Sequence, residues 1–186
     1  MDYNFLKNID DKDKSTLTST FCGIISSLKH VSINKISSVL RYIPNMCRMH
    51  HLSSENRILK NSHERKYHPL KTHRGEIYNA IITEGIGSEL SGNHLVIIIQ
   101  NKKGNIYGEK VNVLPIEGNG NKINPNYQIQ LSNDNLEDGA LDKNPSRIII
   151  TDIMTFDKAR LDRKIGKIKP EHMLKISKML KSQLEL

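Results

Sequence analysis

Hydrophobic residues in the first third of the chain recur with the spacing of α-helices. A first set lies at i, i+4, i+7, i+8 and i+11 and consists of Leu17, Phe21, Ile24, Ile25 and Leu28. A second set consists of Ile33, Ile36, Val39, Leu40 and Ile43. This spacing places each set on one face of a helix. We expect Ser15 to cap the first helix and Pro44 to end or kink the second.

The segment 47–73 is polar and basic and offers few side chains to a core. It predicts one weak helix, followed by a linker that contains Pro69. Four of its residues have the spacing of a zinc finger with one ligand exchanged, and they are Cys47, His50, His63 and His68. The core positions of such a finger fall on Ser54 and Lys60, however, so we favour a basic, exposed segment without a metal.

After residue 73 the hydrophobic period changes from helical spacing to alternation. The alternating residues 77–83 predict a half-buried strand, and the continuous apolar run 95–100 predicts a fully buried one. Residues 84–93 between them contain three glycines and several polar turn formers, so we expect a mobile loop. Residues 101–105 predict a hairpin turn.

Three further strands and a closing helix complete the predicted fold. The strands are expected around residues 111–113, 127–131 and 147–151, where apolar positions alternate or form a short run. Pro170 suits the first position of a C-terminal helix, and Glu171 in its first turn complements the helix dipole. About five short strands with a closing helix predict a mainly β (α+β) fold, a small barrel or half-barrel. A helical, basic extension (residues 1–73) precedes this domain (residues 74–186).

The formal charge of +8 is unevenly distributed along the chain. Residues 1–73 contain 12 Lys and Arg against 6 Asp and Glu, whereas the remaining residues contain 16 against 14. This basic extension suits a polyanion such as RNA, although a solvated surface is the commoner meaning of such charge. No apolar run approaches the roughly twenty residues of a membrane span, and we see no signal peptide. Cys22 and Cys47 are too few for a disulfide framework, so we expect a reduced, cytoplasmic setting.

Short motifs follow one another in a fixed order in residues 74–186. They are Arg74-Gly75-Glu76-Ile77-Tyr78, Gly87-Ser88-Glu89, the strand that ends in Gln100-Asn101, and Thr155-Phe156-Asp157-Lys158-Ala159-Arg160-Leu161. In this order and spacing they resemble the MazF/PemK family of toxin endoribonucleases. The resemblance implies an SH3-like β-barrel with a C-terminal helix, usually as a homodimer. It also implies metal-independent cleavage of single-stranded RNA at short sequences, no cofactor, no membrane partner, and a cognate antitoxin protein that silences the toxin.

The resemblance also points to two catalytic positions, and both depart from the family. An Arg-Pro pair follows the Gly-Ser-Glu loop in the family and a Thr or Ser ends the third strand, whereas this chain has His94-Leu95 and Glu117 there. Cleavage through the 2′-hydroxyl needs a base, an acid and stabilisation of charge on phosphorus. An imidazole suits proton transfer near neutral pH, Glu117 could act as the base or hold the imidazole, and Glu89 is a third candidate. The alternatives are an ordinary polar His94 and a solvated Glu117.

Five other residues are predicted to contact RNA, and they are Arg74, Ser88, Asn101, Lys102 and Lys103. The three cations among them would offset the repulsion between a carboxylate and the phosphate. Because the same fold also serves a toxin that poisons gyrase, the alternative function is a non-catalytic nucleic-acid-binding or target-poisoning protein. Residues 1–73 match nothing in the family; they could pack on the barrel or its dimer mate, bind RNA, shield the site or form a silent tail.

Overall fold

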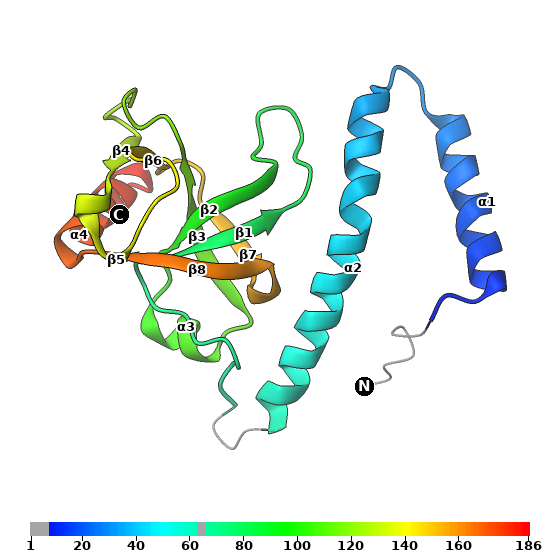
Figure 1. Ribbon diagram of the computed structural model, residues 1–186, viewed down its shortest axis with the longest axis horizontal. Helices are drawn as coiled ribbons and strands as arrows, with labels where there is room; N and C mark the ends of the chain where they lie inside the picture. The colour runs from blue at the N-terminus through cyan, green and yellow to red at the C-terminus, as the bar shows by residue number, and fades with distance from the viewer. Residues whose placement is uncertain (1–7, 63–65) are drawn as a thin grey trace. The chain divides into compact units, whose positions relative to one another are not determined.

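A computed structural model describes residues 8–62 and 66–186 (Figure 1). The chain forms two units, of which the first ends at Asn45 and the second begins at Met46. The second unit contains a mainly antiparallel, curled sheet closed by a C-terminal helix, and helices precede it. The predicted mainly β half-barrel with a C-terminal helix and a helical N-terminal part is therefore confirmed. None of the helices in the described residues combines the length and hydrophobicity that a membrane span requires.

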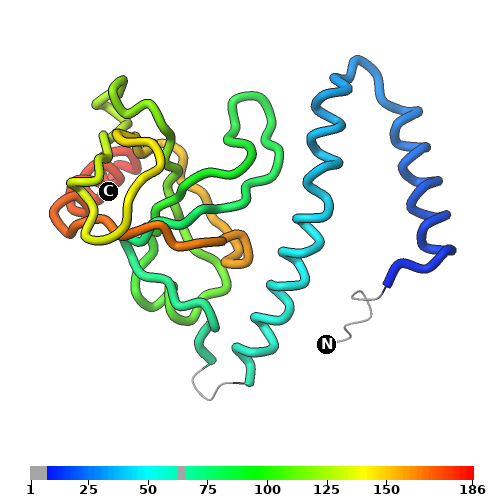
Figure 2. Tube along the Cα trace, in the orientation of Figure 1, coloured from blue at the N-terminus to red at the C-terminus, as the bar shows by residue number. Residues whose placement is uncertain are grey.

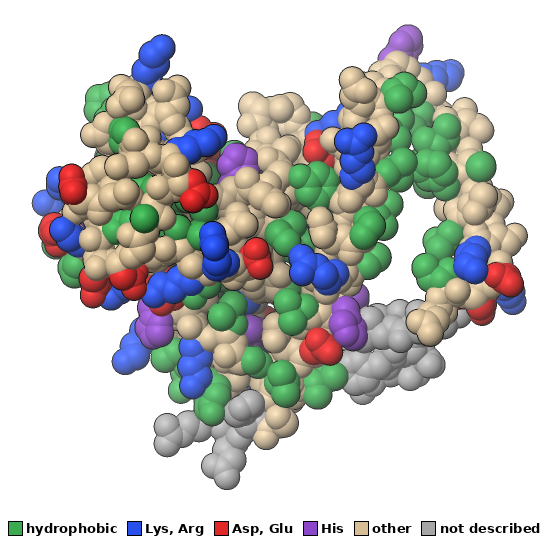
Figure 3. Space-filling model, in the orientation of Figure 1, with side chains coloured by type: hydrophobic (Ala, Val, Ile, Leu, Met, Phe, Trp, Pro, Cys, Tyr) green, Lys and Arg blue, Asp and Glu red, His purple; other side chains and the backbone are tan. Residues whose placement is uncertain are grey.

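The first helix, α1 (Asp11–Ser27), follows the predicted apolar stripe, but its cap differs from the prediction. The side chain of Asp10 accepts a hydrogen bond from the backbone N of Asp13 at 2.8 Å, and the Asp13 carboxylate accepts one from the Asp10 backbone at 3.4 Å. This reciprocal capping box starts the helix more than a turn before Ser15, so the predicted Ser15 cap is wrong. The large apolar side chains of α1 lie on the surface (Figure 3).

The second helix, α2 (Ile33–Ser62), continues through Pro44 and includes part of the polar segment. The helix predicted within residues 47–73 is present up to Ser62, but it is continuous with the preceding helix, which does not end at Pro44. A proline inside a helix removes one backbone hydrogen bond and costs about 3 kcal/mol, so the helix needs compensating contacts. Residues 46–62 have such contacts, because this part of α2 packs against the sheet within the second unit.

Three contacts fix this part of α2 on the second unit. The side chain of Met49 is 7% exposed and forms a small apolar cluster with Ile81 and Ala159. Ser53 Oγ donates a hydrogen bond to Asp157 Oδ2 at 2.8 Å. Lys60 Nζ lies 3.3 Å from Glu109 Oε1, and Arg57 Nε lies 3.6 Å from the other oxygen of that carboxylate. An apolar contact, a hydrogen bond and an ion pair thus hold one helix face.

Eight strands in residues 66–186 form one antiparallel sheet in the order β4-β6-β3-β2-β1-β8-β5, with β7 paired to β3. They are β1 (Glu76–Ile82), β2 (Gly92–Ile98), β3 (Lys110–Glu117), β4 (Gln128–Leu131), β5 (Leu136–Gly139), β6 (Ser146–Ile149), β7 (Met154–Asp157) and β8 (Leu161–Ile168). The loop that joins β1 to β2 extends beyond both strands (Figure 2). The pattern did not predict β5, β7 and β8, because β5 and β7 have four residues each and β8 exposes charged side chains.

Short helices connect some of the strands. The helix α3 (Lys102–Tyr107) replaces the predicted hairpin turn after β2, because the Asn101 side chain accepts a hydrogen bond from the Gly104 backbone at 2.8 Å and caps a helical turn. Two 3₁₀ turns, η1 (Asn133–Asn135) and η2 (Lys158–Arg160), precede β5 and β8. The closing helix α4 (Pro170–Gln183) begins at Pro170, as predicted.

The sheet buries apolar side chains on both faces, which explains its near-continuous hydrophobic strands. One face packs against α4, and its buried residues include Ile77, Ile97, Leu114, Ile148 and Ile176. The other face carries a second cluster that includes Tyr78, Val96, Val113, Phe156 and Leu161. The central strands β1, β2 and β3 contribute to both clusters, so their ends are held rigidly. Side chains at these strand ends are well suited to a functional site.

Candidate active site

A row of polar side chains crosses four neighbouring strands at one end of the sheet. Leu95 of β2 lies opposite Ile116 of β3, so His94 and Glu117 are the next facing residues on these strands. Glu117 in turn pairs with Arg147 of β6, and Arg147 pairs with Gln130 of β4. Directly opposite residues share a face, with Cβ atoms about 5 Å apart. The register therefore brings together His94 and Glu117, which are 23 positions apart in the sequence.

His94 and Glu117 line one pocket of about 360 Å³. The polar residues around it are Asn79, Asn93, His94, Glu117, Asp142, Lys143 and Ser146. Both His94 and Glu117 are partly exposed, so a substrate can reach them. The pocket offers an imidazole, a carboxylate and a nearby cation in one place, which are the groups that general acid-base chemistry on a phosphodiester uses.

The imidazole of His94 is oriented by the loop that precedes β2. Its Nε2 lies 2.8 Å from the carbonyl oxygen of Ser91. A carbonyl oxygen can only accept a hydrogen bond, so Nε2 carries the hydrogen in this contact. Nδ1 is then the ring nitrogen that can exchange a proton with a substrate. A histidine held by a backbone carbonyl at one nitrogen has a defined tautomer for acid-base work.

Arg147 forms an ion pair with Glu117. Glu117 Oε2 accepts hydrogen bonds from Arg147 Nη2 at 2.8 Å and from Nε at 3.2 Å. Arg147 Nη1 also donates to the carbonyl oxygen of Lys122 at 3.2 Å, which fixes the guanidinium plane. The pair is about one quarter exposed at Arg147, and it neutralises the carboxylate that would otherwise repel a phosphate. Sequence reasoning missed Arg147, because only the register between β3 and β6 places it here.

The other predicted residues lie outside this pocket. Ser88 and Glu89 are exposed in the β1–β2 loop and line a second pocket of about 530 Å³, together with Thr155, Phe156 and Arg160. Glu89 Oε2 accepts a hydrogen bond from the Ile86 backbone at 2.8 Å, so this carboxylate shapes the loop. The structure therefore does not bring Glu89 into the pocket with His94 and Glu117.

A third pocket, of about 690 Å³, contains three of the predicted RNA contacts. Arg74, Asn101 and Lys103 line it together with Tyr107, and Lys102 is exposed on the same short helix. Arg74 Nη2 donates to Ser177 Oγ at 3.1 Å. Positions 94 and 100, on β2 and its extension, are six residue steps apart and so span about 20 Å at about 3.3 Å per residue. These cations therefore lie at the other end of β2 from His94, and the cation beside Glu117 is Arg147.

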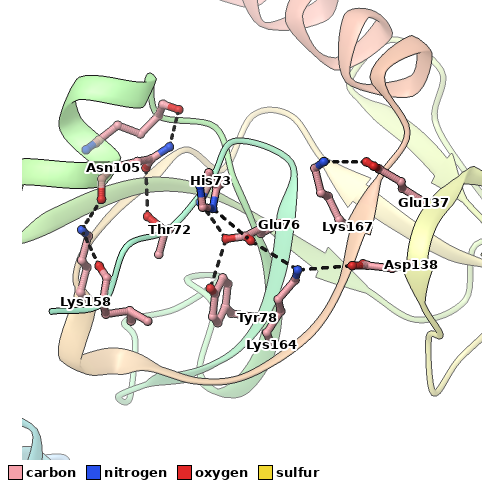
Figure 4. A network of polar contacts seen from close by, with 12 residues as sticks. Thr72, His73, Glu76, Tyr78, Asn105, Glu137, Asp138, Lys158, Lys164 and Lys167 are labelled. Atoms are coloured by element: carbon pink, nitrogen blue, oxygen red, sulfur yellow. Dashed lines mark hydrogen bonds and ion pairs between the residues drawn. The ribbon is translucent and has the colours of Figure 1, made fainter. Parts of the chain in front are cut away.

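The Arg-Gly-Glu-Ile-Tyr motif has a structural role, which Figure 4 shows. Glu76 is buried, and its Oε2 accepts hydrogen bonds from the His73 backbone at 2.7 Å and from Tyr78 Oη at 3.1 Å. Lys164 Nζ lies 3.3 Å from the other carboxylate oxygen. Burial, together with the Glu76 charge, raises the pKa of Tyr78. This network fastens the start of β1 to β8.

Lys158, from the motif Thr155–Leu161, fastens the segment that leads into β1. Lys158 is 1% exposed, and its Nζ donates to the carbonyl oxygens of Leu70 at 3.0 Å and Asn105 at 2.6 Å (Figure 4). Thr72 Oγ1 also donates to Asn105 Oδ1 at 3.1 Å. Burial, helped by the nearby charge of Lys60, lowers the pKa of Lys158 to about 8. Glu76, Tyr78 and Lys158 of the quoted motifs thus position the chain around the start of β1.

Candidate metal ligands are dispersed in the part of the chain that the structure describes. No group of three or more His, Cys, Asp or Glu side chains gathers there in an arrangement that could hold an ion. Of the residues with zinc-finger spacing, Cys47 and His50 lie exposed on α2 and His68 is buried with its Nδ1 near the Leu70 backbone. His63 lies outside the described residues.

The chain is similar to solved structures and matches a known protein family. MazF from Deinococcus radiodurans matches with a TM-score of 0.50 at 12% identity, over 62% of this chain and 97% of that chain, which supports the fold. An endoribonuclease in complex with its cognate antitoxin from Mycobacterial species matches with a TM-score of 0.47 at 20% identity, over 62% of this chain and 96% of that chain. The family described as "PemK-like, MazF-like toxin of type II toxin-antitoxin system" matches residues 73–184, more than half of the chain. As its ordered motifs predicted, the chain belongs to this family of toxins.

Proposed function

We propose that this toxin is a sequence-specific endoribonuclease that cleaves single-stranded RNA through the 2′-hydroxyl, without a metal. The observation that carries the proposal is the pocket in which His94 and Glu117, at the family's two catalytic positions, face each other on β2 and β3. Family membership supports RNA as the substrate. A cognate antitoxin that silences the enzyme and a homodimeric assembly are parts of the same proposal.

In the proposed reaction His94 transfers the proton. Nδ1 of His94 removes the 2′ proton, the 2′ oxygen forms a bond to phosphorus, and the bond from phosphorus to the 5′ oxygen breaks. The leaving 5′ oxygen takes a proton from solvent, so the products are a 2′,3′-cyclic phosphate and a 5′-hydroxyl. Arg147, which pairs with Glu117, is proposed to stabilise negative charge on the phosphoryl oxygens. Glu117 in turn holds the guanidinium and stands beside the imidazole.

The remaining predicted residues are proposed to hold RNA away from the bond that is cut. Arg74, Asn101, Lys102 and Lys103 form a basic and amide-bearing surface around α3, where phosphates and bases can bind. Ser88 is proposed to contact the RNA from the β1–β2 loop. Replacing Arg74 and Lys103 by alanine should weaken RNA binding and lower the slope of its salt dependence by about one for each phosphate that the variant no longer binds. The rate of cleavage at saturating RNA should change little.

Cleavage of a long mixed-sequence RNA in excess chelator tests the proposal. The wild-type protein should produce fragments with 2′,3′-cyclic phosphate ends. His94→Ala should slow cleavage by on the order of a hundredfold or more, as the loss of a general acid-base does. Glu117→Ala should slow cleavage less, and Ser88→Ala least. His51→Ala, which removes an exposed histidine of α2, is the matched control and should cleave normally.

Two results would overturn the proposed chemistry. A His94→Ala protein that cleaves as fast as the wild type would show that His94 does not transfer the proton. A rate that is flat between about pH 5 and pH 8 would contradict a histidine role as well. If the wild-type protein binds RNA but leaves it intact, a non-catalytic nucleic-acid-binding or target-poisoning function of the same fold is the better account.

A further inference from the structure

The helix α1 presents an uncovered apolar stripe. No residue within α1 is buried, and its large apolar side chains are between 38% and 57% exposed. They are Leu17, Phe21, Ile24 and Ile25, and Leu28 follows at the cap. The first turns of α2 expose Ile33 and Val39 in the same way. A stripe of this size exposed to water favours association, because its burial removes apolar surface from water.

The charges along α1 indicate what covers the stripe. Residues 15–28 contain no charged side chain, so nothing in that stretch repels a second copy of the same helix. The start of the helix has a net charge of −1, from Asp10, Asp11 and Asp13 against Lys12 and Lys14, whereas Lys29 and Lys35 follow its end. A partner of one charge sign would be repelled at one of the two ends. An antiparallel copy of α1 instead places each acidic start beside a basic end.

The spacing within the stripe is consistent with such a pairing. If two antiparallel copies cross at Phe21, Leu17 of each copy faces Ile25 of the other, because both residues lie four positions from the crossing point. Asp13 then faces Lys29, because each lies eight positions away. The same register therefore pairs Leu17 with Ile25 and Asp13 with Lys29, while Lys14 faces Leu28, each seven positions from the crossing point. Antiparallel helices also oppose their dipoles favourably.

We propose that α1 is a self-association surface that pairs two copies of this chain antiparallel across a two-fold axis at Phe21. Each residue pair then occurs twice, as an isologous contact requires. The proposal does not depend on ribonuclease activity.

Cysteine cross-linking in the full chain tests the pairing directly, and it is informative whether or not the barrels also dimerise. Cys22→Ser and Cys47→Ser remove the native thiols. In that background Leu17→Cys together with Ile25→Cys should form disulfide-linked dimers under mild oxidation. The matched control replaces Thr16 and Ser26, two residues that lie off the stripe, by cysteine. If the control pair links the chains as fast as the stripe pair, the proposed register is wrong.

Charge exchange separates association from simple misfolding. Phe21→Asp should weaken association through α1 by about thirtyfold or more, as the loss of a central aromatic anchor does, and should abolish cross-linking between positions 17 and 25. Asp13→Lys should slow this cross-linking, and adding Lys29→Asp should restore it. Lys12→Asp, which lies off the stripe, should not restore it. Failure of Lys29→Asp to rescue Asp13→Lys would overturn the antiparallel register.

Discussion

Replacing Lys158 by methionine should alter how the stability of this protein depends on pH. Lys158 is 1% exposed, and the atoms that its Nζ contacts are the carbonyl oxygens of Leu70 and Asn105. Burial lowers its pKa from 10.5 to about 8. At about 1.4 kcal/mol for each pKa unit, keeping this amine charged in the folded protein costs about 3 kcal/mol at neutral pH. The two hydrogen bonds offset part of that cost.

The sign of the pH effect follows from proton binding. Between pH 8 and pH 10.5 the unfolded chain keeps a proton on this lysine that the folded protein has lost. The free energy of unfolding should therefore rise with pH in this window, by up to about 1.4 kcal/mol per pH unit. Below pH 8 both states are protonated, so this contribution is flat. Above about pH 10 unfolded tyrosines lose protons while Tyr78 keeps its own, which reverses the trend.

Urea unfolding of wild type and Lys158→Met at several pH values from 7 to about 9.5 measures the effect. The rise with pH should be present in the wild type and absent in Lys158→Met. At pH 7 the variant avoids the cost of the buried charge but removes the donor from two carbonyl oxygens, at up to about 1–3 kcal/mol each. Its stability should therefore stay close to that of the wild type. Lys110→Met, at an exposed position on β3, is the control and should keep the rise. Parallel curves for wild type and Lys158→Met would refute the reasoning.

Two further substitutions test the packing of the fold. Gly139→Ala should destabilise the protein by at least about 2 kcal/mol in urea unfolding, because Gly139 has φ +82° and an added Cβ would collide with the Ile165 carbonyl oxygen. The control Gly23→Ala, where the Cβ meets open space in α1, should be neutral or stabilising. Equal effects of the two substitutions would contradict this account. Met49→Ala should lower the free energy of unfolding by about 2 kcal/mol or more, because it removes the apolar contact between α2 and the sheet. Met46→Ala, at a 47% exposed position, should lower it little. A similar small decrease in stability for both variants would show that α2 does not depend on Met49.

Elements with strong local patterns were predictable from the sequence. The closing helix starts at Pro170 because proline suits the first helical position and its missing N–H costs nothing there. The continuous apolar run in β2 is buried on both faces of the sheet, and few other structures can accommodate such a run. The family was predictable too, because its motifs keep their order along the chain, and the match to residues 73–184 confirmed it.

Features that depend on distant contacts were not predictable in this way. The helix α2 continues through Pro44, and residues 46–62 of that helix pack on the sheet. The short strand β7 exists because it pairs with β3, since four residues carry too little pattern of their own. Local propensity is a weak guide wherever a partner from another part of the chain supplies the stabilising contact.

In the candidate site, too, some features followed from the sequence and others only from the tertiary structure. From the sequence by itself, the resemblance to the family predicted that His94 and Glu117 occupy the two positions at which the family carries its catalytic groups. The tertiary structure decided that they share a pocket, that Arg147 neutralises Glu117, and that Glu89, Arg74 and the lysines of α3 lie elsewhere. The reason is register: facing residues on β2, β3 and β6 are set by hydrogen bonds between strands, and a shift by one residue would turn each of these side chains to the other face of the sheet.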